Sequence, residues 1–398
     1  MSNLKIFANT IDQKAKDQIN ELLDQDAFKD CKVRIMPDVH AGAGCVIGFT
    51  ADLGDKVIPN IVGVDIGCSM LCCNIGNVEI DFDKLDNVIK NNVPSGRNIR
   101  EDCIESFPEL KSMFCYNQLR NRDRFDKSVG TLGGGNHFIE VNVSSNGIIK
   151  YLVIHTGSRN VGKQVADYYQ NLAIDNLCGK NRLNSLISKM VEEYKFDGRE
   201  DAIQFAIKEL KENFYKSSPE IPKELCYLIG EEREMYLHDM KICQRFALKN
   251  KEVIASVICK NMNWGIANEI HTVHNYIEEE TNMVRKGAIS AKKDEIVIIP
   301  INMRDGSIIG VGLGNEDWNY SAPHGAGRLM GRRNAKRTLS LDEYKEEMSG
   351  VYTTSVCFDT LDEAPMAYKP IEEIVECIEP TVRVLDIIKP IYNFKAVE

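Results

Sequence analysis

Residues Gly133-Gly134-Gly135-Asn136-His137 lead directly into the apolar run Phe138-Ile139-Glu140-Val141-Asn142-Val143. The run is short and rich in β-branched residues, which favours a β-strand, and the three glycines favour a tight turn before it. A second predicted strand, residues 148–155, ends in His155. Consecutive glycines let backbone N–H groups approach a phosphate closely, although a flexible hairpin has the same composition.

The sequence on both sides shows the same pattern of short apolar runs separated by turn residues. Apolar runs at residues 32–36, 46–50, 57–64 and 70–75 predict further strands joined by Gly, Asp and Pro turns. Helical periodicity dominates from residue 162 to residue 263. Strands return at 287–311, and a helix at 341–348, a loop at 362–365, a helix at 371–378 and a strand at 382–394 complete the expected order. This order predicts an α+β fold: one unit over residues 1–398, with mixed β-sheets around a cleft and a helical insertion at 162–263.

The composition of the chain limits which kinds of protein it can be. The chain has 398 residues, 43% of them hydrophobic, and a formal net charge of -10. It begins Met-Ser-Asn-Leu-Lys-Ile, has no run long enough to span a membrane and has no CxxC pair among its 13 cysteines. We therefore expect a cytoplasmic protein with reduced thiols and no membrane partner. The bulk charge does not indicate a nucleic-acid binder, but a local basic run can provide one, and the chain has such a run at Arg328, Arg332, Arg333, Lys336 and Arg337.

Rare metal-binding residue types are concentrated in Gly-rich or polar turns. The chain has seven histidines, and four of them lie in such blocks. Histidine, cysteine and aspartate bind transition metals, so the blocks predict one composite site assembled by folding. The blocks are Asp65-Ile66-Gly67-Cys68, Asn136-His137, His155-Thr156-Gly157-Ser158-Arg159, His274-Asn275 and His324-Gly325-Ala326-Gly327-Arg328. Taken alone, the first block favours the alternative of a turn-capping aspartate beside a buried structural cysteine, and the other blocks change this balance.

Two blocks carry further expectations. His271 and His274 are three residues apart on a predicted helix, which would place them on one face. His324 is preceded by Pro323, flanked by glycine and followed by Arg328. An exposed imidazole beside guanidinium groups suits nucleophilic attack on phosphorus, because the arginines stabilise the developing negative charge. An ordinary loop histidine is the alternative for this block alone.

In this order and at these spacings, the blocks resemble the RtcB family of GTP-dependent RNA ligases. The resemblance runs from Met36-Pro37-Asp38-Val39-His40 to Lys395. It implies an enzyme that joins RNA ends bearing a 2′,3′-cyclic phosphate or 3′-phosphate to a 5′-hydroxyl, through a guanylylated histidine. It also implies GTP, two Mn²⁺ ions, broken tRNA or rRNA as partner, and a possible accessory activator protein.

The resemblance also assigns residues. Cys68 would bridge two metal ions, with Asp65 and His137 completing one site and His155 and His274 the other. His324 would be the catalytic nucleophile, and Arg159 and Arg332 would contact nucleotide or RNA phosphates. His238 and His271 have no ligand role in the pattern. The nucleotide would be held by Asn136, Glu140, His274, Asn275, Ser307, His324, Gly325, Ala326, Gly327, Arg328, Tyr368 and Lys395.

The chain departs from the family pattern at Pro300–Gly306, before the nucleotide serine, and by the extension Ala396-Val397-Glu398. These departures resemble a divergent branch associated with RNA repair rather than tRNA splicing. Two alternatives stay open: a dinuclear metal phosphohydrolase acting on RNA ends, and a non-catalytic sensor of RNA damage. A thiolate ligand generally favours softer metals than manganese, so manganese rests on the resemblance.

Overall fold

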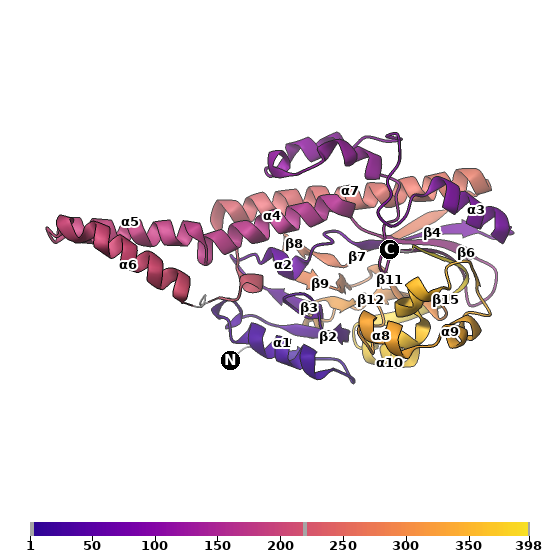
Figure 1. Cartoon of the computed structure of the whole chain (residues 1–398). Helices are drawn as coiled ribbons and strands as arrows, with labels where there is room; N and C mark the ends of the chain where they lie inside the picture. Colours follow the sequence, from indigo (N-terminus) through magenta and orange to yellow (C-terminus); the bar gives the residue numbers. More distant parts are fainter. Residues whose placement is uncertain (1–3, 218–220, 397–398) are drawn as a thin grey trace.

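The computed structural model describes residues 4–217 and 221–396. The fold is α+β, as the sequence predicts, with mixed sheets covered by helices (Figure 1). The C-terminal residues Val397 and Glu398 of the noted extension lie outside the described residues. Within the described residues, no helix is both long and apolar enough to cross a membrane.

The larger sheet has the strand order β11-β12-β15-β5-β6-β4-β7, and β14 pairs with β15. Its strands come from both halves of the chain. The long C-terminal strand β15 pairs with β12 on one side and with β5, from the first half of the chain, on the other. Their bounds are β4 Ser69–Gly76, β5 Phe138–Val143, β6 Lys150–Thr156, β7 Asn268–Val273, β11 Ile296–Asn302, β12 Gly306–Gly312, β14 Tyr352–Thr353 and β15 Val382–Lys395.

A second sheet has the order β1-β2-β3-β9-β8, and a two-stranded ribbon pairs β10 with β13. The ribbon carries the residue before His324, since Pro323 of β13 lies opposite Ala288 of β10. The bounds are β1 Lys5–Ile6, β2 Arg34–His40, β3 Ile47–Asp52, β8 Asn275–Glu278, β9 Met283–Lys286, β10 Ala288–Ser290 and β13 Ser321–Pro323.

The long helix α7 (Gly230–Met262) covers one face of the larger sheet. Its residues Ile254, Ile258 and Met262 share a buried apolar cluster with Leu71 of β4 and Ile154 of β6. The opposite face of the sheet buries a second cluster that includes Met70, Val153 and Ile298. The central strands are thus buried on both faces, which explains why their sequences are nearly continuous apolar runs.

Helices α4 (Arg159–Leu177) and α7 lie side by side, while α5 (Lys180–Phe196) and α6 (Ile203–Lys216) project away from the body as an arm (Figure 1). Only Leu183 and Ala206 of the arm helices are buried. The remaining helices are α1 Gln13–Leu23, α2 Pro59–Val62, α3 Phe82–Asn92, α8 Arg332–Thr338, α9 Leu341–Glu347 and α10 Ile371–Ile378. The boundaries of the insertion, 162 and 263, remain a prediction.

Three local predictions are wrong. Residues 57–64 do not form a strand: Val57 makes one bridge to Leu228, and Pro59 starts the short helix α2. Proline suits the first turn of a helix, where its missing N–H leaves nothing unpaired. His271 lies on strand β7 rather than on a helix, and His274 follows that strand. Residues 362–365 are not all loop, because Asp362 and Glu363 end a 3₁₀ helix, Phe358–Glu363.

Candidate active site

Four neighbouring strands of the larger sheet each have one end on the same side of the sheet, and the metal-binding residue types lie at those four ends. Cys68 precedes β4, His137 precedes β5, His155 lies at the end of β6, and His274 follows β7. Because adjacent strands run antiparallel, the starts of β4 and β5 meet the ends of β6 and β7. Strand pairing alone therefore gathers residues that are more than 200 positions apart.

The turn before β4 adds Asp65. Gly67 adopts a φ of +71°, and a Cβ built there would lie 2.8 Å from the backbone of Gln244 on α7. Glycine is therefore required both for the turn and for its close packing. The Cys68 N–H donates to the carbonyl of Asp65 over 3.1 Å, which directs both side chains of the turn to the same place.

Two overlapping groups of ligand atoms result. One contains Cys68, His155 and His274, the other Asp65, Cys68 and His137, and the donor atoms of each group lie within 4.8 Å of one another. The Cys68 Sγ lies 3.2 Å from His155 Nε2 and 3.6 Å from His137 Nε2. His137 Nε2 lies 3.1 Å from the Asp65 carboxylate. The structure thus brings together all five residues predicted to bind metal, with Cys68 common to both groups.

Backbone carbonyls select the ring nitrogens that face the groups. His137 Nδ1 lies 3.0 Å from the carbonyl of Leu132, and His155 Nδ1 lies 3.2 Å from that of Asn136. In each ring Nδ1 thus faces a carbonyl acceptor, and Nε2 is the nitrogen that faces Cys68. Burial lowers the pKa of His155 and of His274 well below the ordinary value, so both rings are neutral. A neutral imidazole beside a thiol and a carboxylate fits a divalent transition metal.

His324 lies between this cluster and a cavity. Its ring centroid is 4.8 Å from that of His274. Its Nδ1 lies 2.6 Å from Oδ2 of Asp38, and its backbone N–H donates to the same oxygen over 3.2 Å. Asp38 is fully buried on β2. The carboxylate accepts the Nδ1 proton, which leaves the lone pair on Nε2 available for attack on an electrophile.

Gly327 explains how the chain after His324 reaches β2. A Cβ at Gly327 would lie 2.3 Å from the carbonyl oxygen of Asp38, and its φ is +75°. Only glycine permits this approach. The glycine-rich sequence around His324 therefore has a packing role next to the residue that positions the imidazole.

The cavity has a volume of about 670 Å³ and His324 lies in its wall. The wall also contains Asn136, Glu140, Gly325, Ala326, Gly327, Arg328, Arg332, Tyr368 and Lys395 from the predicted nucleotide and phosphate residues. Ser307 is not part of the wall: it is fully buried in β12, and Asn302, Met303 and Gly306 take its place there. His274 and Asn275 lie outside the wall too, and the Asn275 amide is engaged by the backbone of Asp65 and Gly287.

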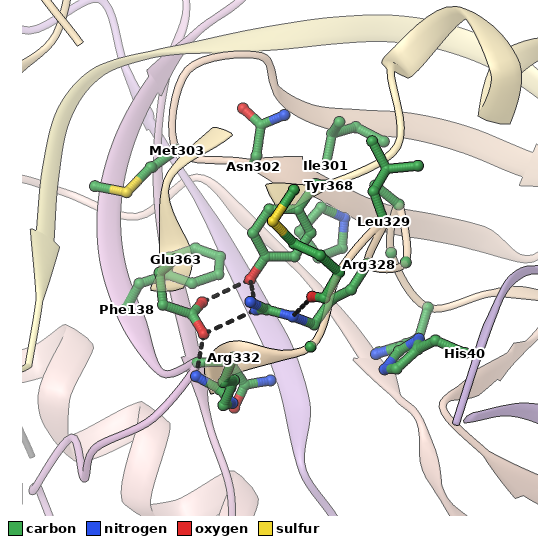
Figure 2. A pocket seen from close by; sticks show the side chains of 18 of the residues that line it. His40, Phe138, Ile301, Asn302, Met303, Arg328, Leu329, Arg332, Glu363 and Tyr368 are labelled. Carbon is green, nitrogen blue, oxygen red and sulfur yellow. Dashed lines mark hydrogen bonds and ion pairs between the residues drawn. The ribbon is translucent and has the colours of Figure 1, made fainter. Parts of the chain in front are cut away.

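Glu363 links four of the predicted residues, as Figure 2 shows for three of them. Its carboxylate accepts from the Tyr368 hydroxyl at 2.6 Å, pairs with Arg328 at 3.2 Å and with Lys395 at 2.6 Å, and also pairs with Arg332. Burial would raise the pKa of Glu363, but the three cations hold it at about 2. The carboxylate therefore stays charged and fixes these side chains along one side of the cavity.

Glu140 is the second buried carboxyl in the wall. Its oxygens accept from Asn142 at 3.2 Å and from Asn393 at 2.8 Å. Burial nevertheless raises the pKa of Glu140 to about 7. A carboxyl poised near neutrality can accept hydrogen bonds from a ligand N–H group, and binding such a group would favour its ionised form.

Arg159 lies beside Gly133, next to His137 of the metal-binding cluster, and is not part of the cavity wall. Its guanidinium donates to Thr131 and to the carbonyl of Gly96, both at 3.0 Å. A Cβ at Gly133 would collide with it at 1.8 Å, so the first glycine of the glycine block makes room for this arginine. His271 lies outside both metal-binding groups and contacts Ser69 Oγ.

The sequence did not single out Asp38, His40 or Glu363. Asp38 and His40 stand in the quoted block before the first turn, but nothing in their spacing links them to His324, 286 positions away from Asp38. Glu363 was part of a predicted loop. Its one sequence signal was the surplus of basic residues assigned to a single pocket, since buried cations need a partner.

Comparison with known proteins finds one family. A family model described as "tRNA-splicing ligase RtcB" matches residues 26–118 and 111–396. The RNA-splicing ligase RtcB1 of Escherichia coli ATCC 25922 is 28% identical over 394 residues, covering 89% of this chain and 87% of that protein. The RNA-splicing ligase RtcB of E. coli K12 shows the same identity and coverage. The tRNA-splicing ligase RtcB of Nanoarchaeum equitans is 28% identical over 418 residues, covering 86% of this chain and 83% of that protein.

Proposed function

The chain belongs to the RtcB family, and from this premise we propose that it joins RNA ends bearing a 3′-phosphate or 2′,3′-cyclic phosphate to 5′-hydroxyl ends. GTP would be the energy source, and the natural RNA would be broken tRNA or rRNA. An accessory activator protein belongs to the same proposal. The observation that carries it is His324: a positioned imidazole lies between a Cys/His/Asp cluster and a cavity of nucleotide size.

The proposed first step uses residues with distinct tasks. Asp38 holds the Nδ1 proton of His324, so that Nε2 attacks the α-phosphorus of GTP. A P–N bond forms, and the P–O bond to pyrophosphate breaks. Arg328, anchored by Glu363, lies beside the attack site and offsets negative charge that develops on the phosphoryl oxygens. Glu140 and Lys395 stand at the part of the wall we assign to guanine.

The second step transfers GMP from His324 to the RNA 3′-phosphate, and the 5′-hydroxyl oxygen then attacks that phosphorus and releases GMP. A 2′,3′-cyclic phosphate is first opened by water. Asp65, Cys68, His137, His155 and His274 would hold two Mn²⁺ ions. When bound, these ions would neutralise phosphate charge and orient the nucleotide for in-line attack.

We further propose a cytoplasmic location. All thirteen cysteines lie among the described residues, and each of them is a free thiol. A reducing compartment suits such a chain, and the Cys68 side chain would need protection from oxidation in order to hold a metal ion.

The test is covalent labelling with α-³²P-GTP and Mn²⁺, followed by denaturing electrophoresis. We expect an acid-labile, alkali-stable label on the wild type and none on His324→Ala, while His238→Ala, whose ring lies outside the site, keeps it. A wild type that never labels yet removes RNA terminal phosphates would establish the phosphohydrolase instead. RNA binding with neither activity would establish the damage sensor.

A further inference from the structure

The cations in the cavity wall differ in how they are paired. The wall contains Lys14, Arg328, Arg332 and Lys395. The last three form ion pairs with Glu363. Lys14 is exposed and has no ion-pair partner among the described residues. Among the described residues it is therefore the wall cation that has no carboxylate partner of its own.

The basic residues of helix α8 also divide into those that form ion pairs and those that form none. Arg332 and Lys336, four positions apart on one face, both pair with Asp362. Arg333 and Arg337 form the neighbouring face, and both are exposed. Neither has an acidic partner in residues 4–217 and 221–396, and Arg337 makes only a hydrogen bond to Asn334 of the same helix. The basic run thus has a structural face and an unpaired face.

Lys14 stands on a fixed support. Buried Lys369, next to the cavity residue Tyr368, donates to the carbonyls of Thr10 and Pro37, both at 2.7 Å. The Gln18 side chain of α1 donates to the carbonyl of Gly42 and accepts from its N–H, at 2.8 and 3.1 Å. These contacts attach the segment before α1 to β2 and the second turn of α1 to the loop after β2. A cation on a rigid turn loses less entropy on binding than one on a mobile segment.

Lys14 lies in the cavity wall together with Arg332 and Asn334 of α8, and Arg333 and Arg337 belong to the same short helix. We propose that Lys14, Arg333 and Arg337 form a track that binds the phosphates of a single RNA strand leading into the cavity. The chain carries a net charge of -10 and as a whole repels a polyanion. Local unpaired cations are then required for RNA to approach, and they also set the path of the strand.

This inference rests on the proposed function, but RNA binding can be measured without GTP. The probe is a fluorescent single-stranded RNA with a 3′-phosphate, and its affinity for the full-length protein is measured by anisotropy against KCl concentration. Each phosphate contact contributes about 0.7 to the salt slope for single strands. The triple variant Lys14→Gln, Arg333→Gln, Arg337→Gln should therefore lower the slope by about 2 and the affinity at 0.15 M salt by on the order of 50-fold.

The matched control is Lys16→Gln, Lys189→Gln, Lys208→Gln, three exposed lysines on α1 and on the arm that have no ion pair among the described residues. It changes the net charge equally and should keep the wild-type slope. An unchanged slope in the test variant, or an equal loss in the control, overturns the track. Labelling by GTP that falls in parallel with RNA affinity would assign these cations to the nucleotide and likewise overturn it. A wild type that never labels refutes the ligase proposal and leaves the slope measurement valid.

Discussion

The contact between Asp38 and His324 yields the sharpest prediction. Asp38→Asn preserves the shape of the side chain and lets an amide oxygen accept from the His324 backbone N–H. It removes the negative charge that lies 2.6 Å from Nδ1. In the wild type this charge stabilises the imidazolium character that develops as Nε2 attacks. A hydrogen bond to a charged group contributes roughly 1.5–3 kcal/mol, which corresponds to about a 10- to 150-fold slower covalent step.

Single-turnover labelling with GTP at saturating Mn²⁺ measures this step directly, and equilibrium GTP binding is measured in parallel. We expect slower labelling with little change in the dissociation constant of GTP, because Asp38 acts through His324 and does not touch the nucleotide. Asp12→Asn is the control: Asp12 lies in the same cavity wall, and asparagine also caps helix α1. A labelling rate for Asp38→Asn within two-fold of the wild type would refute the positioning role.

Three further predictions concern the metal-binding cluster and the fold. Cys68→Ala should lose at least one bound Mn²⁺ and all ligation, because its Sγ belongs to both ligand groups, whereas Cys45→Ala, also buried, should keep metal content by elemental analysis. The pKa of Glu140 is about 7 in the folded protein against an ordinary 4.5, so protonation of this carboxyl stabilises the fold. As pH rises from 4.5 to 7, the free energy of unfolding of the wild type should therefore fall relative to that of Glu140→Gln. Urea unfolding should show a loss on the order of 3 kcal/mol. Asp239→Ala should cost roughly 3–5 kcal/mol, because it removes the acceptor of the buried Cys115 amide, the buried Tyr169 hydroxyl and the part-buried Phe114 amide. Exposed Asp30→Ala should leave the melting temperature unchanged.

The strands that carry the site could be predicted, because each is a short β-branched run bounded by glycine or aspartate. Phe138–Val143 has the predicted bounds, and β6 ends one residue beyond the predicted His155. The two wrong predictions at residues 57–64 and 271–274 share a cause. A short apolar run and a three-residue spacing fit either helix or strand, and only the surroundings decide. Pro59 and the β-branched residues around His271 were the available local signals.

The pairing partners could not be predicted, since they lie far apart in the sequence. Nothing near His324 indicates Asp38, and nothing near Arg328 or Lys395 indicates Glu363. Such buried ion pairs depend on which elements the fold places face to face. Ser307 stays a prediction: its position in the pattern suggests a nucleotide contact, and its hydroxyl is buried in β12 without a hydrogen-bond partner among the described residues.

The parts of the site come from separate structural layers, and this has a consequence for catalysis. The metal-binding cluster lies at the edge of the larger sheet, Asp38 belongs to the second sheet, and His324 follows the β10–β13 ribbon. The distance between His324 and the cluster is therefore set by packing between layers rather than by any single strand. His155 lies on β6, and Cys68 and His137 directly precede β4 and β5 of the same sheet, so metal binding by these residues should tolerate small shifts between layers. The guanylylation we propose requires both layers in register, so it should be the first activity lost when that packing is weakened.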